Sequence, residues 1–142
     1  MPALLRAARG AYAHAMSRRL AAGGFDDLPR NGPSVLGGIT MHGGSLTYLV
    51  QELAVSKQAA SQLIDSLAQR GYLERNPDPT DRRRISLHLT DRGRRAFDAV
   101  LAGIAEVDGE LAARLSPEDL RGLRKGLAEL TAIHRLTAQC DP

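Results

Sequence analysis

The sequence is poor in cysteine, aromatic residues and long apolar runs, and each shortage excludes a class of protein. The 142 residues include one cysteine, Cys140, so no disulfide can form within a chain and a reducing compartment is expected. No apolar run approaches the roughly 18 residues that a membrane-spanning helix needs. The first residues place Arg6 and Arg9 in an amphipathic pattern, unlike a secretory signal. We therefore expect a cytoplasmic protein with no membrane partner.

Candidate catalytic and metal-binding groups are also scarce. The four histidines fall on different expected elements and lack the paired spacing of metal ligands. The glycine pairs at 37–38 and 43–44 are not followed by the Lys-Ser of a phosphate-binding loop. Because no nucleophile with a neighbouring base can be named, we expect no catalytic residue, no metal, no cofactor and no enzyme activity.

Arginine and small aliphatic residues are abundant. Aromatic residues make up 4% of the chain and tryptophan is absent, so the core must consist mostly of Leu, Ala, Ile and Val, which suits packed helices. The 19 basic residues include only two lysines, Lys57 and Lys125. Arginine favours bidentate contacts with phosphates and bases, although a GC-rich coding bias accounts for most of this enrichment. The length favours a single domain.

Apolar spacing predicts long helices at both ends of the chain. Residues 2–22 carry an apolar residue at every fourth position from Leu4 to Leu20, and Gly23 and Gly24 end the pattern. Thr90 caps a helix whose apolar stripe reaches Leu115, and Ser116-Pro117 begins a last helix with a second stripe.

The middle of the chain reads as two short helices, a tight turn and a third helix. Residues 25–33 are typical of a loop, and a short helix over 34–41 is weakened by two glycines. Thr47 caps a helix to Leu53. Ser56 caps the next, which ends near Arg70 before Gly71 and has an inward face of Ala60, Leu63, Ile64 and Leu67.

A two-stranded ribbon follows this third helix. Residues 72–75 and 85–89 are strand candidates, and the Pro-, Asp- and Arg-rich segment 76–84 reads as an exposed loop between them. A helix, tight turn, helix and ribbon in this order is the layout of a winged helix-turn-helix. The predicted fold is therefore mainly α with a small two- or three-stranded β wing.

The outer face of the third helix is polar near its N-terminus. Gln can pair with adenine, Ser can contact several groups, and Lys reaches guanine or phosphate, so such a face suits a DNA major groove. Any amphipathic helix has a polar face, but this one has no acid before Asp65 and follows a helix and turn. The candidate major-groove residues are Ser56, Lys57, Gln58, Ser61 and Gln62.

The loop of the ribbon carries three consecutive arginines, Arg82, Arg83 and Arg84, beside Asp81. Arginines on a loop are often only solvated, but narrow minor grooves attract them. Residues 46–95 hold nine basic and six acidic residues, which equals the net charge of +3 of the whole chain. We expect these arginines to contact DNA and Asp81 to orient one of them. Arg75 is either a phosphate contact or, as we favour, part of an ion pair.

The stretch over residues 49–94 resembles the core of the MarR (multiple antibiotic resistance regulator) family. Three segments carry the resemblance: VSKQAASQLIDSL, RGYLER, and PDPTDRRR followed by LT and RG. The resemblance implies an obligate dimer on a near-palindromic site of double-stranded DNA, and repression with release by a small anionic or aromatic ligand. It also implies that the glycine-rich GGITMHGGS lies near the ligand crevice.

Family layout further implies dimerisation helices at 1–24 and 96–142 around a DNA-binding lobe at 31–95, within a single domain over 1–142. The same residues map to DNA: Ser56, Lys57, Gln58, Ser61 and Gln62 in the major groove, and Arg82, Arg83 and Arg84 on the wing. Two alternatives stay open, a ligand-independent architectural DNA-binding protein and a protein-interaction module.

Overall fold

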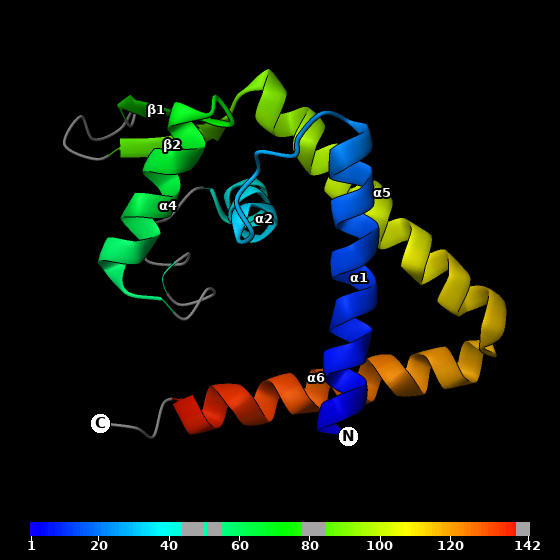
Figure 1. Ribbon diagram of the computed structural model, residues 1–142. Coiled ribbons are helices and arrows are strands. Elements are labelled where there is room, and N and C mark those ends of the chain that lie inside the picture. The colour runs from blue at the N-terminus through cyan, green and yellow to red at the C-terminus, as the bar shows by residue number, and fades with distance from the viewer. Residues whose placement is uncertain (44–49, 51–54, 78–84, 139–142) are drawn as a thin grey trace. The chain divides into compact units, whose positions relative to one another are not determined.

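The computed structural model describes residues 1–43, 50, 55–77 and 85–138, and there it contains five helices and one two-stranded sheet (Figure 1). The mainly α fold with a small β wing is thus confirmed. The chain divides into two compact units, Met1–Ile104 and Ala105–Pro142. Among the described helices, none has an 18-residue stretch apolar enough to cross a membrane.

Helix α1 (Pro2–Ala22) has the predicted bounds. Pro2 occupies the first turn, where a missing N–H costs nothing. The helix ends at Gly23, and Gly24 follows with a φ of 76°, which glycine adopts without strain. The apolar stripe is buried only near this end, since Leu20 is 8% exposed whereas Leu4 is 73% exposed.

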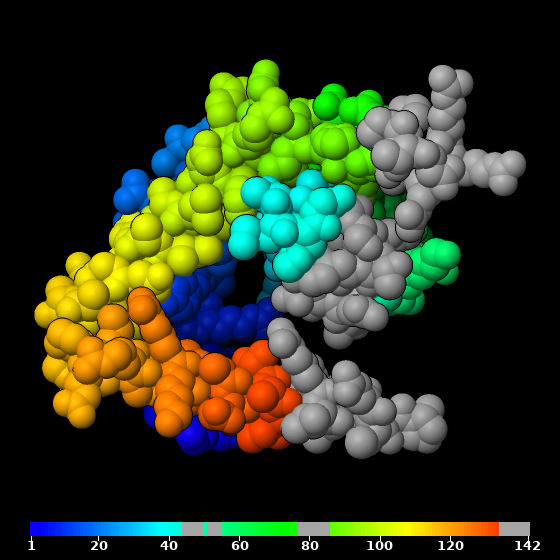
Figure 2. All heavy atoms as spheres, turned by 180° about the vertical axis from the view of Figure 1, so that it is seen from behind, coloured from blue at the N-terminus to red at the C-terminus, as the bar shows by residue number. Residues whose placement is uncertain are grey.

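Helix α2 (Gly32–His42) begins earlier than the predicted 34–41, because Pro33, a residue type that also favours loops, is tolerated in the first turn of a helix. Its internal glycines are used for close packing, which outweighs their low helix propensity. A Cβ at Gly37 would lie 3.4 Å from Cε2 of Phe97, and the two segments are neighbours in Figure 2. Gly38 is buried. Gly43 ends the helix with a φ of 68°.

Helix α4 (Lys57–Gln69) also agrees with the prediction. Gly71 follows it with a φ of 74°, and the Tyr72 amide then donates to the Leu67 carbonyl oxygen at 2.9 Å. The predicted inward face is confirmed, since Ala60, Ile64 and Leu67 are buried and Leu63 packs against them. The helix predicted over 47–53 falls on a part of the chain that, apart from residue 50, lies outside the described residues.

The antiparallel hairpin consists of β1 (Leu73–Pro77) and β2 (Ile85–Leu89). The first strand runs two residues further than predicted, since Asn76 and Pro77 pair with β2 although their residue types favour a loop. Leu73 pairs with Leu89, and both are buried, whereas the next pair, Glu74 and His88, is exposed. The alternation orients one face of the hairpin toward the core.

Helix α5 (Asp91–Arg114) begins directly after β2, and α6 (Pro117–Ala138) follows it. Both predicted caps are present: the Gly93 amide donates to Thr90 Oγ1 at 3.0 Å, and the Asp119 amide donates to Ser116 Oγ at 3.1 Å. These hydroxyls satisfy amides that a helix start leaves without an intrahelical acceptor.

One hydrophobic cluster joins the end of α1, α2, α4, the hairpin and the start of α5. The buried face of α4 packs against this cluster through Ile64 and Leu67, which leaves the opposite face of the helix exposed. The buried members of the cluster are Leu20, Phe25, Val35, Leu36, Ile39, Ile64, Leu67, Tyr72, Leu73, Leu87, Leu89, Ala96 and Val100.

Candidate nucleic-acid interface

The N-terminus of α4 forms the first part of the candidate interface. Ser56 has extended backbone, and its hydroxyl oxygen accepts a hydrogen bond from the Ala59 amide at 3.1 Å. The first turn contains no acidic residue, so no carboxylate of this turn neutralises the positive end of the helix dipole. Of the five residues predicted to contact the major groove, Ser61 is half-buried. The other four are exposed: Ser56, Lys57, Gln58 and Gln62.

The hairpin is tied to α4 by an ion pair. Arg75 of β1 donates to Asp65 of α4 with a distance of 2.5 Å between Nη2 and Oδ1. The favoured interpretation of Arg75 as an ion-pair partner is confirmed, and the pair neutralises the first acid of the polar helix. Since both side chains are well exposed, its main effect is to fix orientation rather than to add much stability.

The tip of the hairpin contains the remaining predicted contacts. Asp81, Arg82, Arg83 and Arg84 lie outside the described residues. The strand ends Pro77 and Ile85, which pair with each other, bracket this segment. Contacts of these four residues with DNA therefore stay a prediction.

Three interacting side chains, which the sequence did not indicate, connect the loop after α1 to the base of the hairpin. We call this group the Asp27 clasp, and it consists of Asp27, Tyr72 and Arg92. The Tyr72 hydroxyl donates to Asp27 Oδ1 at 2.5 Å, and Arg92 Nη2 lies 2.8 Å from the same oxygen. The Arg92 guanidinium carbon stacks 4.6 Å from the centre of the Tyr72 ring. Arg70 Nη1 adds a bond to the Asp27 carbonyl oxygen at 2.6 Å.

The clasp shifts the acidity of its members. The hydrogen bond from Tyr72 lowers the pKa of Asp27 below its ordinary value of 3.8, with help from the nearby Arg92 and Arg70 charges and some opposition from partial burial. Burial raises the pKa of Tyr72, and its hydrogen bond to Asp27 raises it further. At neutral pH the clasp is thus a phenol donating to a carboxylate.

Asp27→Asn is expected to reduce stability in a pH-dependent way. Because the pKa of Asp27 is lower folded than unfolded, its charge stabilises the fold above the unfolded value near 3.8 and stops doing so as pH falls through the folded value. Denaturant titrations of wild type and variant should differ at pH 6 and converge on acidification below pH 4 (about the unfolded value). A difference that is the same at all pH values would contradict this.

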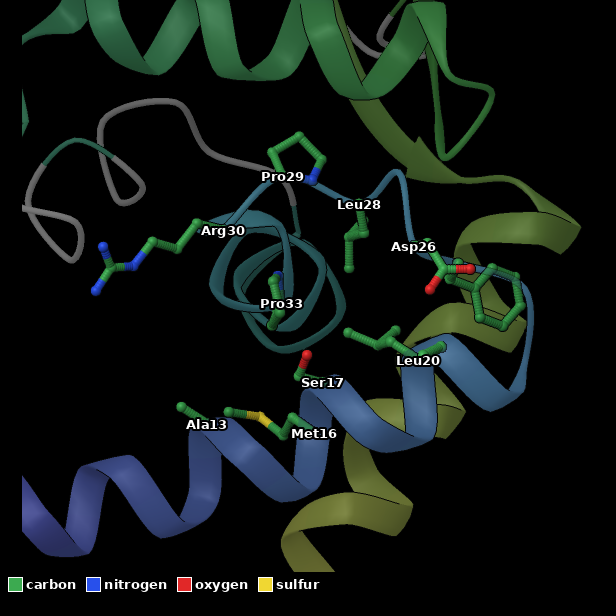
Figure 3. A pocket seen from close by; sticks show the side chains of 11 residues that line it. Ala13, Met16, Ser17, Leu20, Asp26, Leu28, Pro29, Arg30 and Pro33 are labelled. Carbon is green, nitrogen blue, oxygen red and sulfur yellow. The ribbon is translucent and has the colours of Figure 1, made fainter.

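A pocket of about 470 Å³ has Phe25 and Asp26, the two residues that precede Asp27 of the clasp, in its lining (Figure 3). Its wall comes from α1, from the α1–α2 loop (residues 23–31) and from Pro33 at the start of α2. Most of the lining is apolar, and Arg30 and Asp26 add one charge of each sign. Gly37 and Gly38, from the glycine-rich segment expected near a ligand crevice, do not line this pocket, and Gly37 faces Phe97. The position of that segment near a ligand crevice stays a prediction.

Part of the chain is similar to proteins of a known family. The MarR family model matches residues 26–84, which include α2, α4 and β1. The HTH-type transcriptional repressor MdtR of Bacillus subtilis is 30% identical over 87 residues, which are 61% of this chain and 56% of that protein. The chain thus spans just over half the length of the curated relatives that it matches, 51% and 56%.

Solved structures share the fold over nearly the whole chain. The MarR family transcription regulator SP03579 superposes with a TM-score of 0.76 at 20% identity, over 99% of this chain and 89% of that one. A mutant of Staphylococcus aureus MepR bound to an oligodeoxyribonucleotide gives a TM-score of 0.58 at 19% identity, over 92% and 95% of the two chains. At these identities the likeness establishes the winged-helix fold.

Proposed function

Residues 26–84 match the MarR family model, as the sequence resemblance indicated, and we propose that the chain is a homodimeric repressor of this family that binds a specific sequence of double-stranded DNA. The observation that carries the proposal is the exposed, acid-free polar face at the capped N-terminus of α4, held on a buried core beside a hairpin. Support comes also from MepR, whose related fold was solved with an oligodeoxyribonucleotide, and from MdtR, which is named a repressor.

In the proposed complex, α4 of each protomer enters a major groove. Gln58 and Gln62 read base edges, Ser56 and Ser61 contact nearby groups, and Lys57 contacts guanine or a phosphate close to the helix N-terminus. Arg82, Arg83 and Arg84 reach the flanking minor groove, and Asp81 orients one of them. The proposed DNA-binding lobe is residues 31–95.

A second copy of the chain is the proposed partner of the end helices. Large apolar residues are exposed on both: Leu4 and Leu5 on α1, with Met1 directly before it, and Leu123, Leu127, Leu130 and Ile133 on α6. Such rows of exposed side chains mark interaction surfaces. We assign residues 1–24 and 96–142 to dimerisation, which would put two α4 helices on one face of DNA.

The pocket that Phe25 and Asp26 line is the proposed effector site. Its apolar walls suit an aromatic ring, and Arg30 can pair with an anionic group. A small aromatic or anionic ligand would relieve repression by favouring a conformation that fits DNA less well. If no such compound changes operator affinity, the protein is a constitutive regulator.

The first experiment is selection of bound duplexes from a random-sequence pool at two salt concentrations. An inverted repeat with half-sites roughly one helical turn apart supports the dimeric regulator. Salt-sensitive binding without a motif would indicate an architectural protein, and no binding at low salt would favour a protein-interaction module.

Gln58→Ala with Gln62→Ala is expected to weaken operator binding and to relax base selectivity. Each lost bidentate contact costs about 1–3 kcal/mol, so the pair should lower affinity by roughly 30-fold or more. Fluorescence anisotropy on operator and scrambled duplexes measures both effects. Gln69→Ala is the matched control, because Gln69 is exposed at the other end of the same helix. Equal losses on both duplexes would show that these glutamines do not read bases.

A further inference from the structure

The wall of the pocket and the clasp are made by consecutive residues. Phe25 and Asp26 line the pocket, and Figure 3 shows Asp26 on its rim. The next residue, Asp27, accepts the hydroxyl of Tyr72 and pairs with Arg92. Phe25 also touches Tyr72 directly, with ring centres 6.3 Å apart and planes tilted by 60°. A displacement of the pocket wall can thus reach Tyr72 in two ways, through the Asp27 hydrogen bond and through the Phe25 ring contact.

The side chains of the α1–α2 loop are closely packed at both of its ends, so a displaced Phe25 has little free space around it. A Cβ at Gly23 would lie 2.6 Å from Cε2 of Phe25, so the ring is already against the backbone at the end of α1. At the other end of the loop, a Cβ at Gly32 would lie 2.7 Å from Cγ of Leu28. Because closely packed groups transmit displacement rather than absorb it, a shift of Phe25 is passed along residues 25–27.

Tyr72 stands where the DNA-binding elements meet. Its side chain is fully buried, at 0% exposure. Its amide donates to Leu67 of α4 at 2.9 Å, and its carbonyl oxygen accepts the Thr90 amide, at the start of α5, at 3.1 Å. Leu73, the next residue, begins β1. The position of this one residue therefore sets the hairpin relative to the end of α4 and the start of α5.

We propose that Asp27 is a positioning residue that couples the pocket to the DNA-binding hairpin: an apolar ligand that displaces Phe25 pulls Asp27 from the Tyr72 hydroxyl and loosens the hairpin base. The proposal rests on the proposed function for its effect on DNA but not for the coupling itself. A ligand acts here only by binding the displaced arrangement more tightly than the clasped one.

Gly23→Ala imitates the ligand without requiring its identity. The backbone at Gly23 has a φ of −87°, which alanine adopts freely, so the added methyl acts only by pushing the Phe25 ring. Hydrogen exchange of the Tyr72 and Thr90 amides reports the hairpin base. We expect both amides to exchange about tenfold faster in Gly23→Ala than in wild type. Gly10→Ala, on the same helix with nothing within 4 Å of its Cβ, should leave their exchange unchanged.

A double-mutant cycle with Tyr72→Phe separates coupling from general destabilisation. Tyr72→Phe keeps the ring and removes the hydroxyl that Asp27 holds. If the clasp is the link, Gly23→Ala should add less than about twofold to exchange in the Tyr72→Phe background, and operator affinity should show the same non-additivity. Asp27→Ala provides a second background in case Tyr72→Phe disturbs the core.

Two results would overturn the coupling. Equal effects of Gly23→Ala with and without the clasp would mean that Asp27 is not the link, since the ring contact between Phe25 and residue 72 would remain as a route. Unchanged exchange in the single variant would mean that the loop absorbs the displacement. The exchange cycle needs no DNA. A protein that binds no duplex but shows the cycle would thus contradict the proposed function and retain the coupling.

Discussion

Gly93→Ala is expected to lower the free energy of unfolding by about 2–4 kcal/mol, at the upper end of the cost of overpacking. In most exposed helical positions the same change stabilises a protein, because alanine has the better helix propensity by about 1 kcal/mol. The opposite sign is expected here because Gly93 is buried in the first turn of α5 and faces backbone rather than solvent.

The obstacle at Gly93 is a carbonyl group that cannot move alone. A Cβ there would lie 2.1 Å from the carbonyl oxygen of Tyr72 and 3.1 Å from its carbon. That oxygen accepts the Thr90 amide at 3.1 Å, so relief of the clash would separate α5 from the hairpin and break this bond. The Thr90 hydroxyl, which caps α5 and donates to Gly71 at 2.6 Å, would be pulled out of place as well.

Thermal and denaturant unfolding at one protein concentration would test this prediction. A loss of this size should lower the melting temperature by roughly 10 °C in a chain of this length. Gly109→Ala is the matched control, since Gly109 lies in the same helix with nothing within 4 Å of its Cβ, and it should be neutral or stabilising. Equal melting temperatures for the two variants would mean that α5 shifts without cost.

The elements that could be predicted are those with local chemical signals at their ends. Ser56 and Thr90 are side-chain caps, and Gly71 has the positive φ that glycine tolerates, so α4 and the start of α5 were predicted to within a residue. The polar face of α4 could also be predicted, because its apolar residues recur at helical spacing and leave the polar residues on the other side. Its contact with DNA stays a proposal, as do the contacts of Asp81 and the wing arginines.

The elements that could not be predicted depend on contacts between distant residues. Gly37 lowers the propensity of α2, yet it allows the Phe97 ring to approach, sixty positions away in the sequence. Asp27 reads as a solvated loop residue, and nothing near it in sequence indicates that it holds Tyr72, which is separated by 45 positions. Propensity and spacing describe single elements, whereas the clasp depends on how three of them meet.

Leu127→Glu with Leu130→Glu is expected to convert the proposed dimer to a monomer and to lower operator affinity by at least about 100-fold. Leu123, Leu127 and Leu130 lie on one face of α6, because spacings of four and three residues follow the helical turn. They are 41%, 42% and 39% exposed, which leaves a continuous apolar row uncovered in the single chain. Two carboxylates would have to lose their water for the row to be buried.

Affinity should fall because each chain supplies one α4 to one half-site. Linking two such helices makes the second contact intramolecular, and a monomer loses that gain although its own DNA-binding surface is unchanged. Sedimentation should give twice the chain mass of 15.3 kDa for wild type and the single mass for the variant. Ala132→Glu adds the same kind of charge on the opposite side of the exposed helix and should change neither mass nor affinity. A wild-type protein that sediments as a monomer at micromolar concentration would contradict the proposed dimer.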